Sequence, residues 1–199
     1  MINIKKEILF GTLLGDANLQ TYTGGKTWRI RFIQSNINKS YLFHLYYVFE
    51  EFVKTPPKLS YLKSGHSRWT FNTTVQPIAL EFSKIFYNNK KNKILPSKEM
   101  LMKYLTPLAI SYWYMDDGSL KSNCLSYYLC TDSFKLSELK ILKEVFKEKY
   151  DIDINFHKTS VQKEQRGYRI YIPKRESYKF YKLIEKYIHR DMKYKLGNH

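Results

Sequence analysis

Cysteine and long apolar stretches are both scarce in this chain. Its 199 residues include two cysteines, Cys124 and Cys130, without any His/Cys cluster at zinc-ligand spacing, so we expect buried, reduced thiols rather than a zinc site. No stretch approaches the ~20 apolar residues that cross a bilayer, and no secretory signal opens the chain. These absences predict an intracellular protein that does not act in a membrane.

Acidic residues are outnumbered by basic ones. The chain has 18 Asp and Glu against 34 Lys and Arg, with a formal net charge of +16 and a pI near 9.6, which points to a polyanionic partner. Its hydrophobic content of 43% allows a real core, in one domain or two fused half-domains. Heavy use of Lys, Asn, Ile, Tyr and Phe fits an A/T-rich genome and permits an origin in a mitochondrion or plastid.

Two apolar segments in different halves of the chain both end in a carboxylate. Residues 10–17 read FGTLLGDA, and residues 111–118 read SYWYMDDG. The apolar spacing predicts helices over residues 7–15 and 105–116, with Gly11 and Gly15 on one face, where they allow another helix to approach closely. A carboxylate in a last helical turn faces unpaired carbonyls and is unfavourable without a cation. We predict that Asp16 and Asp117, rather than Asp116, share a divalent-metal site, because Asp117 aligns with Asp16.

The rest of the chain repeats one order of elements: helix, strands, helix, strands, helix. Residues 88–93 are the expected connection between the halves. The other expected elements are strands at 28–34, 58–63, 68–74, 125–131, 153–159 and 168–173, and helices at 38–53, 77–87, 136–150 and 176–188.

A lysine follows each carboxylate in similar register. Lys93 lies 77 positions after Asp16, and Lys195 lies 78 after Asp117, which indicates a diverged duplication or, alternatively, chance in a lysine-rich chain. Phosphodiester hydrolysis needs a metal, an activated water and a cation near the developing charge. The two aspartates could hold the metal and the two lysines could stand beside its waters. The alternative for each lysine is a solvated surface charge.

Further polar side chains fall on or beside the predicted strands. A curved sheet could lay them along a major groove, although they would also suit the polar face of any antiparallel sheet. They are Arg29, Arg31, Gln34, Lys58, Lys63, Arg68, Lys158, Lys163, Arg166 and Arg169.

These motifs resemble those of the LAGLIDADG homing endonucleases, single-chain type. Residues 9–17 and 110–118 are the two motif copies, and the segments around Lys93 and Lys195 look like the branch that includes the mitochondrial omega-intron endonuclease. The resemblance implies an α+β fold of two αββαββα half-domains, 1–97 and 98–199, related by a pseudo-twofold axis within a monomer. It also implies a saddle of two four-stranded sheets over a long double-stranded DNA site.

For the chemistry, the resemblance implies cleavage of both strands to short 3′ overhangs. The last aspartate of each motif would bind Mg²⁺, or another divalent cation such as Mn²⁺, and we count the motif-closing Ala17 and Gly118 with this metal site. Ala17 replaces the usual closing glycine. Tyr112 stands where the pattern has a glycine, so the helix interface must accommodate its ring.

Three functions are compatible with this pattern. The first is a site-specific DNA endonuclease that spreads its own intron or intervening sequence. The second is an RNA-binding maturase that assists splicing of its host intron. The third is a DNA-binding regulator on the same scaffold, which would have lost its carboxylates. Because Asp16, Asp117, Lys93 and Lys195 are all present, we favour the endonuclease.

Overall fold

The structure, a computed structural model, describes residues 3–121, 125–159 and 167–197. These residues form two copies of an αββαββα unit, which confirms the predicted fold class. The first copy contains α1 (Ile4–Leu14), β1 (Asn18–Gln20), β2 (Arg29–Ser35), α2 (Lys39–Val48), β3 (Lys58–Tyr61), β4 (Ser67–Asn72) and α3 (Pro77–Phe86). The second contains α5 (Pro107–Asp117), β5 (Gly118–Lys121), β6 (Ser126–Leu129), α6 (Leu136–Tyr150), β7 (Asn155–Thr159), β8 (Gly167–Ile172) and α7 (Lys174–Ile184). Helix α4 (Lys98–Tyr104) precedes the second unit.

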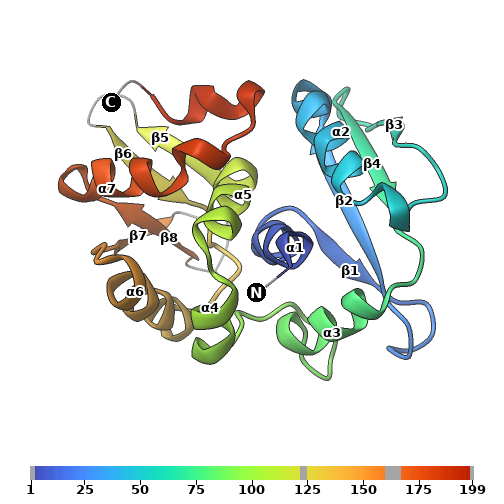
Figure 1. The fold of residues 1–199 in the computed structure, drawn as a ribbon, viewed down its shortest axis with the longest axis horizontal. Helices are drawn as coiled ribbons and strands as arrows, with labels where there is room; N and C mark the ends of the chain where they lie inside the picture. Colours follow the sequence, from blue (N-terminus) through green and yellow to red (C-terminus); the bar gives the residue numbers. More distant parts are fainter. Residues whose placement is uncertain (1–2, 122–124, 160–166, 198–199) are drawn as a thin grey trace.

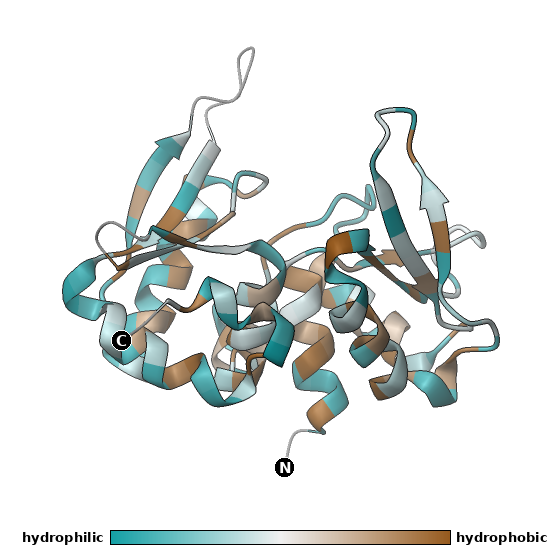
Figure 2. Ribbon diagram, turned by 90° about the horizontal axis from the view of Figure 1, so that it is seen from above, coloured by the Kyte–Doolittle hydropathy of each residue, from teal (hydrophilic) through white to brown (hydrophobic). Residues whose placement is uncertain are grey.

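Each unit has one four-stranded antiparallel sheet, and the two sheets have the same topology. The strand orders are β1-β2-β4-β3 and β5-β6-β8-β7. Helices α1 and α5 lie side by side in the centre, with one sheet on either side (Figure 1). In the second view the β3–β4 hairpin and strands β7 and β8 extend to the same side of the helices, so the sheets form the two flanks of a saddle (Figure 2).

Strand β2 shows how the sequence fixes the two faces of a sheet. Ile30 and Phe32 are buried against the helices, while the alternate residues Arg29 and Arg31 point to the opposite face. The apolar residues of both units join one continuous core. Arg29 and Arg31 are therefore left on the concave side of the saddle.

Some element boundaries differ from the sequence prediction for local reasons. The helix expected over 105–116 begins later, at Pro107, because Thr106 caps it by accepting a hydrogen bond from the Ala109 N–H and proline suits the first helical turn. The helix expected over 38–53 ends at Val48 and continues as a short 3₁₀ turn, Glu50–Phe52. The short strands β1 and β5 and helix α4 were not predicted.

The sequence predicted buried, reduced thiols and no membrane-spanning segment, and the described residues bear on both predictions. Cys130 is a free thiol, but it is only partly buried, with its Sγ 3.2 Å from Asp132 Oδ2. Cys124 lies outside the described residues. Among the helices of the described ranges, none has the length and apolar character required to span a bilayer.

Candidate active site

The C-terminal ends of α1 and α5 meet at the centre of the molecule, and glycine is required there. A Cβ on Gly11 would lie 2.1 Å from the backbone oxygen of Ala109, and one on Gly15 would lie 2.5 Å from Asp116 Cβ. Neither position has room for a side chain. The predicted close approach of a second helix to this face of α1 is confirmed.

Tyr112, the departure from the glycine of the pattern, points away from this close contact. Its hydroxyl lies 2.6 Å from His44 Nε2 on α2, and its ring stacks on that imidazole at a centroid distance of 6.0 Å. The ring therefore fills space between α5 and the first half of the protein. Burial raises the pKa of Tyr112 well above its usual range.

Two carboxylates stand at these helix ends. Asp16 follows α1 and is exposed, and Asp117 is the partly exposed last residue of α5. The surrounding protein still restricts solvation, so desolvation raises the pKa of Asp16. Desolvation, followed by the charge of Asp16, raises the pKa of Asp117 to about 7. Two such groups at carbonyl-rich helix ends favour a bound cation.

The two predicted lysines converge on the same place with matching contacts. Lys93 Nζ donates to the carbonyl oxygen of Gly15 at 3.1 Å, and Lys195 Nζ donates to those of Met115 at 2.6 Å and Asp116 at 3.3 Å. Each ammonium thus caps the helix that carries the aspartate of its own half. Desolvation lowers the pKa of both lysines, while Asp16, Asp116 and Asp117 oppose the shift. Both lysines are half-buried, so neither is a solvated surface charge.

Two further residues join the cluster, and sequence reasoning gave them other roles. Gln34, expected to contact DNA, is buried with 4% exposure, and its Nε2 donates to Asp16 Oδ2 at 3.0 Å and to Asp116 Oδ1 at 2.9 Å. Asp116 also accepts the Asp16 N–H on Oδ2 at 3.3 Å. The sequence signal for Asp116 is its alignment with Gly15, a small residue at a crowded position, which places Asp116 in the interface between α1 and α5.

The donor set fits a divalent cation. No group of three or more His, Cys, Asp or Glu side chains in the described ranges is arranged to hold a metal ion. The Asp16 and Asp117 carboxylates could hold a cation such as Mg²⁺, since Mg²⁺ keeps several waters and binds one or two carboxylates together with phosphate oxygens. Ala17 and Gly118 could offer a cation only their backbone carbonyl oxygens, since an amide N–H does not ligate a cation, and their N–H groups donate to the carbonyls of Thr12 and Tyr114.

The concave face of the first sheet carries most of the expected DNA-contacting residues of that half. Strand pairing places their side chains on one face, because Arg31 pairs with Asn72, Lys58 pairs with Thr70 and Ser35 pairs with Arg68. Lys63 lies in the turn between β3 and β4. The members of this face are Asn18, Gln20, Arg29, Arg31, Ile33, Ser35, Lys58, Ser60, Arg68, Thr70 and Asn72.

The second sheet presents a different surface. Arg169 lies on its concave face but is paired with Asp132, with Nη2 3.0 Å from Oδ2. Beside it His157 stacks on Tyr171 at 4.2 Å and its Nδ1 lies 3.1 Å from the Tyr128 hydroxyl. Lys158 alternates with His157 and lies on the other face of β7. Lys163 and Arg166 lie outside the described residues.

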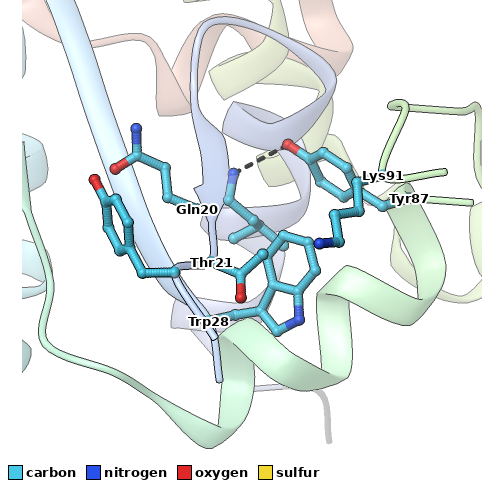
Figure 3. Close-up of a pocket in the computed structure, with 7 residues that line it drawn as sticks. Gln20, Thr21, Trp28, Tyr87 and Lys91 are labelled. Atoms are coloured by element: carbon cyan, nitrogen blue, oxygen red, sulfur yellow. Dashed lines mark hydrogen bonds between the residues drawn. The ribbon is translucent and has the colours of Figure 1, made fainter. Parts of the chain in front are cut away.

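A shallow pocket elsewhere is unrelated to the carboxylates. It has a volume of about 280 Å³ and lies where the end of β1 and the start of β2 meet the end of α3 (Figure 3). Trp28 and Tyr87 line it together with Gln20, Thr21 and Lys91, and the Tyr87 hydroxyl accepts the Leu19 N–H at 3.0 Å. The candidate active site is instead formed by helix ends that open onto the saddle.

Comparisons with known proteins agree with this geometry. The family model described as the LAGLIDADG DNA endonuclease family matches residues 6–180. The DNA endonuclease I-ChuI of Chlamydomonas applanata is 34% identical over 208 residues, with 98% of this chain and 94% of that protein covered. The cytochrome b mRNA maturase bI2 of Debaryomyces hansenii is 34% identical over 200 residues, which cover 97% of this chain and 73% of that protein. A solved structure of the homing endonuclease I-WcaI bound to its DNA recognition sequence has a TM-score of 0.87 and 29% identity, with coverage of 98% and 87%.

Proposed function

The chain belongs to the LAGLIDADG DNA endonuclease family, and from this premise we propose that it makes a site-specific double-strand break by metal-dependent phosphodiester hydrolysis. The observation that carries the proposal is the convergence of Asp16 and Asp117 with Lys93 and Lys195 at two adjoining helix ends. Both motif copies are in one chain, so a monomer supplies one carboxylate for each DNA strand. We infer an intron or intervening sequence as the origin of the gene.

The cation-binding residues we propose are Asp16 and Asp117, with Ala17 and Gly118 able to add backbone oxygens. Mg²⁺ is the expected ion, and Mn²⁺ is an alternative with the same preference for oxygen. When bound, such an ion supplies charge that polarises the scissile phosphate and acidifies water.

The protein groups complete the chemistry. Lys93 and Lys195 hold their ammonium groups beside the carboxylates, where they stabilise the negative charge that develops on the phosphate as the water attacks. Their hydrogen bonds to helix carbonyls fix them before substrate binds. The concave face of the first sheet, with Arg29, Arg31, Lys58 and Arg68, supplies contacts to phosphates and base edges.

The test is cleavage of a randomised duplex library in Mg²⁺, followed by sequencing of the ends. The control is the Asp16→Asn/Asp117→Asn double variant, which keeps the shape of both side chains. We expect ends that share one long motif with the wild type and no specific ends with the variant. Specific ends from both proteins would show that these carboxylates are not the catalytic ones.

The maturase-like relative supports a second candidate function, binding of the host intron RNA. The net charge of +16 would serve RNA as well as DNA. Salt-sensitive binding of a structured intron RNA by the double variant, without specific DNA ends from the wild type, would move the assignment to a maturase.

A further inference from the structure

Asp116 and Gly15 occupy equivalent places, since each directly precedes the motif aspartate of its half. The two positions are in contact, and a Cβ on Gly15 would lie 2.7 Å from Asp116 Oδ2. The side chain of Asp116 thus uses the space that the glycine leaves. This pair breaks the symmetry of the two halves at the active site.

The carboxylate of Asp116 contacts the backbone of Asp16 directly and is linked to the Asp16 carboxylate through Gln34. One oxygen, Oδ2, accepts the backbone N–H of Asp16 at 3.3 Å. The other, Oδ1, accepts Gln34 Nε2 at 2.9 Å, and the same nitrogen donates to the Asp16 carboxylate at 3.0 Å. The amide of Gln34 has two N–H groups, so both are used, and its Oε1 accepts Asn38 Nδ2 at 3.3 Å.

Among the described residues, Asp117 has no equivalent of this arrangement. In the part of the chain that the structure describes, no side-chain donor is hydrogen-bonded to the Asp117 carboxylate. The position equivalent to Gln34 in the second half is Thr131, because Asn18 pairs with Arg31 and Ser119 pairs with Tyr128, and both residues follow these partners by three. Thr131 is buried, and its hydroxyl donates to the carbonyl of Tyr168 at 2.7 Å, away from the carboxylates.

We propose that Asp116 is a positioning residue which, through Gln34, holds Asp16 in its working orientation and makes the two strand-cutting groups unequal. The inference rests on the proposed endonuclease function. Asp116→Asn leaves one acceptor where two are needed, so an NH₂ group faces the Asp16 N–H or the Gln34 amide. Asp16 then loses its orientation, whereas the hydrogen bonds of Lys195 to the backbone carbonyls next to Asp117 remain.

The experiment follows nicking of each strand of the cognate duplex with two different end labels. Both Asp116→Asn and Gln34→Ala are expected to slow one strand, the same strand in both variants, at least tenfold more than the other, so that nicked duplex accumulates. Thr131→Val, at the equivalent position of the second half, is the matched control and should not produce this bias. Equal slowing of the two strands, opposite strand preferences or no change would overturn the proposal.

A second readout does not depend on cleavage. Free energies of unfolding for Asp116→Asn, Gln34→Ala and the double variant form a mutant cycle without metal or DNA. Non-additive values are expected if the two side chains are coupled, and additive values would overturn the proposal. If the wild type cuts no DNA, the proposed function fails on its own, while the cycle still decides whether Asp116 and Gln34 are coupled.

Discussion

The carboxylate of Asp117 should reduce the stability of the folded protein, so that Asp117→Asn stabilises it while abolishing double-strand cleavage. The pKa of Asp117 is about 7 in the folded state, against an ordinary value of 3.8, because of desolvation and the charge of Asp16. A group with a raised carboxyl pKa binds its proton more tightly when folded. Stability therefore falls as pH rises from about 4 to about 7, and the full cost is present above pH 7.

The magnitude follows from the shift of about three pKa units. Each unit corresponds to 1.36 kcal/mol, so the ceiling is about 4 kcal/mol. Asp117 is partly open to solvent, and solvent screening reduces this ceiling, so we expect about 1–2 kcal/mol at pH 8. For a protein of this size that is a melting temperature about 3–6 °C higher.

The assay is thermal unfolding of wild type and Asp117→Asn in EDTA at pH 8 and at pH 4. Asp151→Asn is the matched control, because Lys147 and Lys179 hold the pKa of Asp151 at about 2 and its charge is favourable in the folded state. The Asp117 variant should gain stability at pH 8 alone, and the Asp151 variant should gain none. An Asp117→Asn protein less stable than wild type at pH 8, or equally shifted at both pH values, would refute the reasoning.

Three further predictions concern the helix interface, the lysines and the DNA surface. Gly11→Ala should lower the unfolding free energy in urea by about 1–3 kcal/mol, because its Cβ would lie 2.1 Å from Ala109 O; unchanged stability would contradict the packing. Lys195→Ala should slow cleavage about a hundredfold with DNA affinity retained, as judged by single-turnover rates and gel shifts, and a normal rate would exclude its role. DNA affinity should fall with salt with a log–log slope of about −0.9 per neutralised phosphate; Arg31→Ala should reduce that slope by about one, whereas Lys158→Ala should leave it unchanged.

The sequence was sufficient for features that repeat along the chain. The motif helices, the repeated order of helix, strands, helix, strands and helix, and the register of Lys93 and Lys195 follow from local periodicity and from duplication, whereas the full αββαββα order came from the family resemblance. The close approach of α1 to α5 could also be predicted, since Gly11 and Gly15 share one helical face. Such patterns are local, so they can be recognised in the sequence without knowledge of tertiary contacts.

Features that depend on contacts between distant segments could not be predicted from local sequence patterns. Gln34 is the second-last residue of β2, and only the tertiary structure, which brings this end of the strand to the ends of α1 and α5, shows that its side chain contacts carboxylates. Lys158 and His157 are adjacent in the sequence, but the register of β7 with β8 decides which of them faces the saddle. The ring of Tyr112 has its partner, His44, 68 positions away.

The packing of α1 against α5 has a further consequence for a cell that carries this protein. The proposed catalytic groups come from both halves, and the close packing of α1 on α5 at Gly11 and Gly15 brings their two helix ends together. A chain that is incompletely folded, truncated or weakened at this interface loses its catalytic arrangement before it loses its positive charge. Such damage should yield a DNA-binding protein that cannot cut, rather than an indiscriminate nuclease. Dependence of cleavage on the packing of these two helices would therefore protect the cell's DNA from non-specific breaks.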